Sequence, residues 1–104
     1  MQIKKLKKIE IIGTPFKVVW NDKDSGASFD WSTQTIIIGS KYMEKDPNYV
    51  FNLLMHEISE LLHVMLNTRY VDQSAHDNYK FFMDHKEFEN HNFLLSSIIP
   101  KFIV

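Results

Sequence analysis

The sequence contains no cysteine. A disulfide framework and a cysteine-rich structural zinc site are therefore both excluded, and any metal ion must be bound by His, Asp or Glu side chains. The chain also lacks a stretch approaching the roughly 20 apolar residues of a membrane span. Its N-terminus shows no apolar segment of about 7 to 15 residues that would indicate a signal peptide. We therefore expect a cytoplasmic protein that does not enter a membrane.

An excess of charge of one sign is missing as well, since 12 Lys and Arg residues stand against 13 Asp and Glu residues. Without a basic field over the surface, nucleic acid is not expected as a partner. The one basic cluster, at residues 4–8, is interrupted by Leu6 and is typical of a solvated edge or terminus. With 44% hydrophobic and 24% charged residues over 104 positions, and no visible repeat or linker, the chain is expected to form one small domain over residues 1–104.

The first 40 residues carry the pattern of a small β-sheet. Runs rich in β-branched and aromatic residues predict strands at about 9–12, 16–20, 27–31 and 35–38, separated by short polar or glycine-containing turns. Asp46 followed by Pro47 predicts the N-cap and first residue of a helix that runs to about Asn67. Asp84 and Glu87 have the spacing of a capping box, which predicts a second helix from there to about Ile99, stopped by Pro100. The expected fold class is α+β.

The most informative motif, His56-Glu57-Ile58-Ser59-Glu60, lies inside the first predicted helix. Residues four apart lie on one face of a helix, so His56 and Glu60 can both reach one ion, while Glu57 points about 100° away round the axis. In the related pattern H-E-x-x-H, two histidines bind zinc and the glutamate is the general base for a metal-bound water. A carboxylate in the fourth position is still compatible with zinc, because His nitrogen and carboxylate oxygen both bind this ion.

The same segment also fits a plain surface helix. Its polar residues form a stripe nearly opposite the apolar ones, as on any solvated helix face, and this stripe consists of His56, Glu60, His63 and Asn67. Two details favour a site. The stripe has no Lys or Arg, whereas solvated faces usually mix both charge signs. Apolar residues also flank Glu57, which indicates a helix packed on more than one side.

The order of these elements resembles a known family. The segments at residues 11–18, 26–30, 34–38 and 53–58 are similar to the corresponding parts of minimal zincin-type metallopeptidase-like proteins encoded by phages and mobile elements, which are relatives of the domains that cleave phage repressors. The resemblance covers residues 9–99, and its specificity rests on the His56-Glu57 pair and the strand just before it. It implies a zincin-like domain in which a sheet of three or four strands packs on the motif helix and a C-terminal helix completes the metal site.

The resemblance also implies roles for individual residues. His56 and Glu60 would bind Zn²⁺, Glu57 would activate water, and the protein would hydrolyse a peptide bond in a protein or peptide substrate. The third ligand has four candidates, which are His63, His76, His85 and His91. His63 lies about 10 Å along the helix from His56, too far for both to bind one ion comfortably. His85 is favoured because Asp84-His85-Lys86-Glu87-Phe88 resembles the segment that opens the last helix in those phage proteins. We expect it on the buried side of that helix.

Two other classes of function stay open. One is a catalytically silent, metal-stabilised protein-binding module of phage or mobile-element origin, although a structural site needs no base such as Glu57. The other is an α+β interaction domain with no metal, in which the polar stripe is only solvated.

The carboxylate of Glu60 lowers the net positive charge of the site, which should make a bound water less acidic than it is beside neutral histidine ligands. The sequence does not indicate an oligomeric state.

Overall fold

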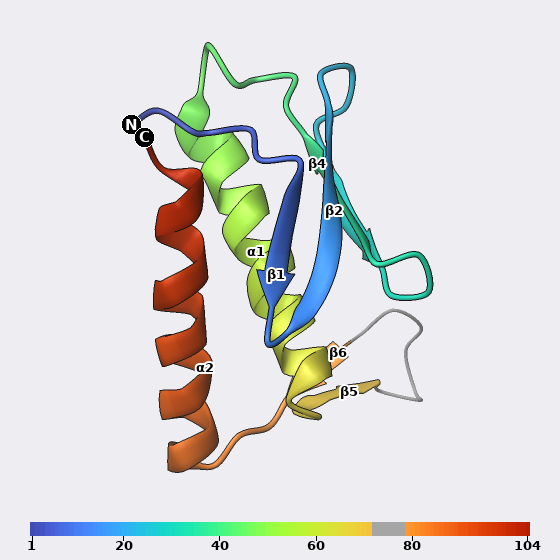
Figure 1. Cartoon of the computed structure of the whole chain (residues 1–104), viewed down its shortest axis with the longest axis vertical. Coiled ribbons are helices and arrows are strands. Elements are labelled where there is room, and N and C mark those ends of the chain that lie inside the picture. The colour runs from blue at the N-terminus through green and yellow to red at the C-terminus, as the bar shows by residue number, and fades with distance from the viewer. Residues whose placement is uncertain (72–78) are drawn as a thin grey trace.

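The computed structural model describes residues 1–71 and 79–104 of the chain. In sequence order the elements are β1 (Lys8–Ile11), β2 (Thr14–Asn21), β3 (Ala27–Asp30), β4 (Thr35–Gly39), α1 (Pro47–Met65), β5 (Arg69–Val71), β6 (Tyr79–Phe81), α2 (His85–Ile98) and the 3₁₀ turn η1 (Ile99–Phe102) (Figure 1). Strands β1 to β4 form one mixed sheet, and β5 and β6 form a small second one. The α+β class and a four-stranded sheet are thus confirmed.

The main sheet has the strand order β1-β2-β4-β3, which places β3 at one edge. Strands β2 and β4 run parallel, and the other two neighbouring pairs are antiparallel. A parallel pair cannot be joined by a tight hairpin, so the chain passes through β3 on the outer side before it returns as β4. The four predicted strands are all present, with ends shifted by one or two residues.

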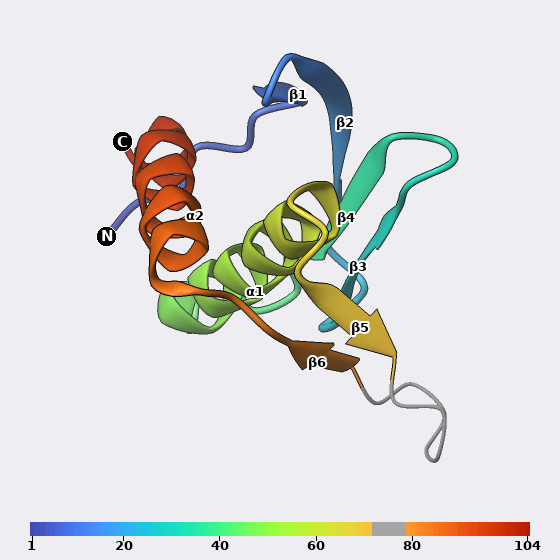
Figure 2. The ribbon, with the colours of Figure 1, turned by 90° about the horizontal axis from the view of Figure 1, so that it is seen from below.

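Helix α1 lies between the sheet and α2 (Figure 2). It begins where the sequence predicts, because the side chain of Asp46 accepts a hydrogen bond from the backbone N–H of Tyr49 and Pro47 occupies the first turn. Five of its apolar side chains have no exposed surface, namely Val50, Leu54, Ile58, Leu61 and Leu62. Burying each of them contributes about 1.5–3 kcal/mol to folding. The expected packing of this helix on more than one side is confirmed.

Helix α2 begins with the predicted capping box. The Asp84 side chain accepts from the backbone N–H of Glu87, and the Glu87 side chain accepts from that of Asp84. The α-helix ends at Ile98, and Pro100 falls inside the 3₁₀ turn that follows it. The sequence of residues 79–83 is compatible with a short strand, and β6 is found at its start, but no pattern predicts β5. None of the helices in the two described ranges is both long and apolar enough to cross a membrane; the cytoplasmic location stays a prediction.

Candidate metal centre

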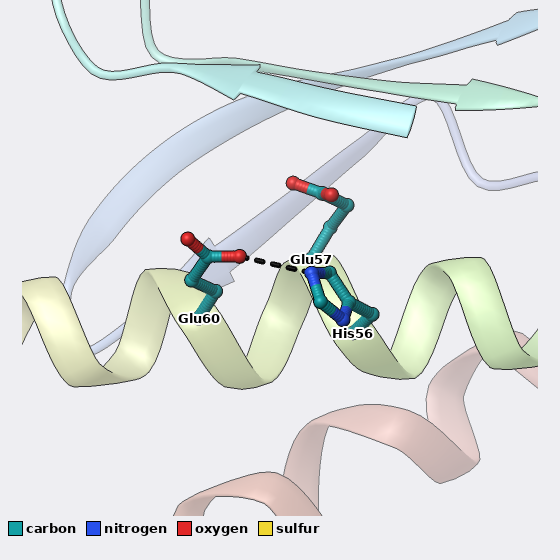
Figure 3. A group of neighbouring side chains, drawn as sticks. All are labelled: His56, Glu57 and Glu60. Carbon is teal, nitrogen blue, oxygen red and sulfur yellow. Dashed lines mark ion pairs between the residues drawn. The ribbon is translucent and has the colours of Figure 1, made fainter. Parts of the chain in front are cut away.

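Three acidic or imidazole side chains of α1 meet beside the edge of the sheet. His56, Glu57 and Glu60 each offer one ligand-capable atom, and these atoms all lie within 4.8 Å of one another. In Figure 3, His56 and Glu60 lie side by side along the helix, while Glu57 points toward the strands. Within residues 1–71 and 79–104 they make up the one group of at least three His, Cys, Asp or Glu residues with metal-binding geometry. The predicted spacing of His56 and Glu60 on one helix face is confirmed.

The contact between His56 and Glu60 has the dimensions of a ligand pair. Their Nε2 and Oε2 atoms are 3.0 Å apart. Two ligands bound to one Zn²⁺ at about 2.0–2.1 Å in a tetrahedron are separated by about 3.3 Å, so only a small adjustment is needed. The imidazole is exposed and the carboxylate is 15% exposed, which leaves the pair open to solvent on one side. These residues fit a divalent metal ion, and a nitrogen and oxygen donor set is accepted by several such ions.

Glu57 is the buried member of the group, with 7% of its surface exposed. No hydrogen bond or ion pair joins its carboxylate to any other residue in the described part of the chain. Burial raises the pKa of Glu57, the charge of Glu60 raises it further, and His56 and Arg69 act in the opposite direction. Among the described residues the only buried side-chain polar atom without a hydrogen-bond partner is Oγ of Ser40, so the oxygens of Glu57 keep contact with water. A carboxylate whose pKa is raised in this way is suited to accept a proton from water near neutral pH.

A cleft of about 240 Å³ adjoins this carboxylate, between α1 and the edge strand β3. It is lined by Ala27, Ser28 and Phe29 of β3 together with Glu57, Glu60 and Arg69. Nothing in the motif analysis singled out Arg69, whose Nε lies 3.6 Å from Oε1 of Glu60. One feature of the sequence could have drawn attention to Arg69, because it is the only Lys or Arg between Lys45 and Lys80.

The other two histidines near α1 are buried and offer no atom to the group, although His63 lines a small pocket of about 180 Å³ together with His56 and Glu60. His63, predicted on the polar stripe, is buried, and its ring stacks on that of His91 with 4.3 Å between the centroids. Its Nδ1 lies 2.8 Å from Oγ1 of Thr68, and Nε2 of His91 lies 3.0 Å from Oγ of Ser59. Neither ring belongs to the group of possible metal ligands formed by His56, Glu57 and Glu60. The part of the stripe formed by His63 is therefore packed between helices rather than solvated.

His85 does not join the candidate site either. It is exposed, and its Nδ1 lies 3.3 Å from Oε1 of Glu89 one turn along α2. The prediction that His85 lies on the buried side of this helix is wrong. The buried side of α2 passes through His91 and Ile98, and His85 lies about 120° from His91 round the axis. Phe88, three residues further along the helix, is also exposed. The remaining candidate, His76, lies outside the described residues.

No family model, curated protein or solved structure matches this chain. The candidate metal centre therefore rests on the geometry of α1 and its neighbours, and the phage metallopeptidase-like family stays a resemblance.

Proposed function

We propose that this protein is a zinc-dependent hydrolase that cleaves a peptide bond, with His56 and Glu60 as ligands of the ion and Glu57 as the general base. One observation carries the proposal. Glu57 is only 7% exposed, and its carboxylate lies beside the cleft and within 4.8 Å of the ligand atoms of His56 and Glu60, with no hydrogen bond to another described residue. A helix that only needed to pack would gain stability from an apolar residue in that place. Retaining the acid fits a chemical role.

Each side chain has a distinct task in this proposal. A bound zinc ion polarises a carbonyl group and lowers the pKa of a water molecule. Glu57 lies between the ligand pair and the sheet, so its carboxylate takes a proton from water and passes it to the leaving amine. Burial of Glu57 supports this task, because its raised pKa brings the base closer to the pH at which it works.

The substrate proposed for this site is an extended segment of a protein or peptide. Strand β3 pairs only with β4 among the strands of the described residues, so its outer edge can accept another strand. An extended peptide that pairs with an exposed edge gains backbone hydrogen bonds. The cleft beside Glu57 runs along this edge, through Ala27, Ser28 and Phe29. By the family resemblance, the substrate proposed is a phage or host regulatory protein.

A catalytically silent, metal-stabilised binding module is the second candidate, and one observation favours it. No second histidine joins His56 and Glu60 within the described residues, whereas Glu57 does have a ligand-capable atom in the group. If Glu57 binds the ion itself, it is not free to act as a base. The two candidates therefore differ in what Glu57 does.

The decisive experiment compares the wild type with Glu57→Gln. A carboxamide keeps the size of the side chain but cannot accept the proton, and general-base catalysis commonly contributes about 10² to 10⁴-fold. Glu44→Gln, the same change at an exposed position, is the control. All three proteins are loaded with zinc, assayed for metal content, and incubated with peptide libraries and candidate repressor proteins, and the products are identified by mass spectrometry. The hydrolase proposal expects equal zinc in all three proteins and loss of cleavage in Glu57→Gln alone. Loss of zinc from Glu57→Gln, with no cleavage by the wild type, would support the binding module.

A further inference from the structure

We propose that Arg69 is a positioning residue of the metal centre, which holds one oxygen of Glu60 so that the other oxygen faces His56. This inference rests on the proposed function only in requiring that the site binds a divalent cation. It assigns a role to a residue outside the helical motif, on a strand that the sequence did not predict. It also distinguishes this site from two isolated side chains on the face of a helix.

The two oxygens of Glu60 have different neighbours. Oε1 lies 3.6 Å from Nε of Arg69, and Oε2 lies 3.0 Å from Nε2 of His56. A glutamate has three rotatable side-chain bonds, so contacts on both oxygens restrict the carboxylate far more than one contact can. Because Oε1 lies toward the guanidinium as an ion-pair partner, the oxygen left to face an ion beside His56 is Oε2. Ligating carboxylates in metal sites are commonly held by such outer partners.

Arg69 is itself held in place from two sides. Its Cζ atom lies 3.6 Å from the ring centroid of Tyr79 and 5.5 Å from that of Phe29. Tyr79 reaches Arg69 diagonally across the β5–β6 pair, and Phe29 belongs to the edge strand of the main sheet. A guanidinium over an aromatic face is stabilised by the electrostatic field of the ring. The orientation of Arg69 is therefore set by two different sheets.

The turn after α1 brings Arg69 back to Glu60. Asn67 has a φ of +57°, a left-handed conformation that asparagine tolerates better than most residues. The backbone N–H of Thr68 then donates to the carbonyl of His63 at 2.8 Å. These contacts reverse the chain at the end of the helix, so that β5 starts beside the last turns of α1.

A comparison inside the molecule shows that this ion pair is unlike an ordinary surface pair. The side chains of His85 and Glu89, which lie one turn apart on the surface of α2, are 84% and 64% exposed. The side chains of Arg69 and Glu60 are 16% and 15% exposed. Exposed pairs contribute little because water screens them and their side chains stay free to move. In the Arg69–Glu60 pair, water screens the charges less and the side chains are less free to move.

The charge of Arg69 has two opposing effects on a bound cation. It repels the ion directly, but it also balances a second carboxylate beside Glu57 and fixes the donor oxygen of Glu60. A single substitution would mix these effects. A double-mutant cycle separates them, because the direct repulsion is present whether residue 60 is glutamate or histidine, whereas the orienting contact needs the carboxylate.

The test measures zinc affinity by competition with a chromophoric chelator for four proteins: wild type, Arg69→Gln, Glu60→His, and the double variant. Zinc alone is the probe, so no substrate is needed. We expect Arg69→Gln to weaken zinc binding about tenfold more in the Glu60 chain than in the Glu60→His chain, the usual size of an outer-partner effect. Circular dichroism and melting of each zinc-free protein monitor the fold.

Each outcome decides between roles. An equal effect of Arg69→Gln in both backgrounds overturns the positioning role and leaves Arg69 as a structural residue. If Arg69→Gln does not fold, Arg69→Lys replaces it in the cycle, because lysine keeps the charge but lacks the planar fork. The same tenfold difference is then expected, and equal affinities overturn the proposal. A wild-type protein that binds no zinc at all refutes the proposed function and this inference with it, whereas zinc binding without coupling refutes this inference alone.

Discussion

The imidazole rings of His63 and His91 stack at 4.3 Å and 28° between α1 and α2. Both rings are buried, and Phe81 of β6 packs on the His63 ring from a centroid distance of 4.4 Å. The single hydroxyl proton of Thr68 is directed at the carbonyl of His63, so Nδ1 of His63 donates its own proton to the Thr68 oxygen. A neutral His63 ring therefore carries its proton on Nδ1, and a second proton on Nε2 would lie beside another imidazole in a place with little water.

The first prediction concerns acid stability. Burial, and to a lesser degree the charge of His91, lowers the pKa of His63 from 6.5 to about 4. The unfolded chain then binds the proton before the folded one, so stability is fully present above pH 6.5 and is lost as the pH falls toward 4. The shift corresponds to about 3 kcal/mol. Urea unfolding of the metal-free protein between pH 7 and 4 should show this loss.

The matched variants for this prediction are His63→Gln and His85→Gln. The first removes the buried titrating ring, and we expect its stability to change much less between pH 6.5 and 4. The second makes the same substitution at the exposed position on α2 and should keep the wild-type profile. Equal profiles for the wild type and His63→Gln would show that the buried ring does not control acid unfolding.

A second prediction concerns the close approach at Gly39. A Cβ atom at this position would come within 2.5 Å of the backbone oxygen of Asp24, whereas at Gly26 the nearest atom is the Asp24 Oδ1 at 4.0 Å. Backbone atoms cannot move aside without displacing the turn between β2 and β3. We expect Gly39→Ala to cost about 1–3 kcal/mol and Gly26→Ala to cost much less. Thermal melting of the two variants checks this order, and equal melting temperatures would contradict it.

The third prediction separates the histidines by metal content. His56→Ala should lose bound zinc, because it removes one of two ligands on the α1 face, and the metal-dependent part of the melting temperature should disappear with it. His85→Ala should keep its zinc, because that side chain is exposed and pairs with Glu89. Elemental analysis after gel filtration measures both. Parallel loss of zinc in the two variants would restore His85 as a ligand.

The fold was predictable from local signals. The strands follow from runs of β-branched residues, and both helix starts follow from side-chain caps at Asp46 and Asp84, which act within a single turn. The pairing of His56 with Glu60 was predictable for the same reason, because residues four apart meet on any helix. These features need no knowledge of which elements pack together.

The features that were missed depend on tertiary packing. Strand β5 has three residues, forms only when β6 pairs with it, and carries Arg69 to a glutamate nine positions earlier in the chain. A helical projection shows which residues of α2 share a side, but the side that faces α1 is decided by the packing. It is the side of His91 and Ile98. The burial of Glu57 likewise comes from the sheet above α1. The apolar residues that flank Glu57 indicated packing on more than one side, but they did not indicate that its side chain points toward the sheet.

The last prediction is that Glu57 lowers the stability of the metal-free protein at neutral pH. Burial and the charge of Glu60 raise its pKa above the ordinary value. As the pH rises, the unfolded chain releases this proton first, so the folded state loses stability through the interval between the two pKa values and stays penalised above it. Glu57→Gln carries no charge and avoids the penalty. We expect the variant to be more stable than the wild type by about 1 kcal/mol at pH 7, a common gain when a strained functional residue is replaced.

Chemical denaturation with a chelator present measures this difference, and repeating it at pH 4 tests the cause. At pH 4 the wild-type carboxyl is largely protonated in the folded state, so the penalty for burying its charge is small. The free energies of unfolding of the wild type and Glu57→Gln should then be close to each other. Glu44→Gln, at an exposed position, should match the wild type at both values. A Glu57→Gln protein that is less stable than the wild type at pH 7 would mean that the carboxylate makes a stabilising contact. The acid would then be part of the packing of α1, and its burial would no longer support a role in chemistry.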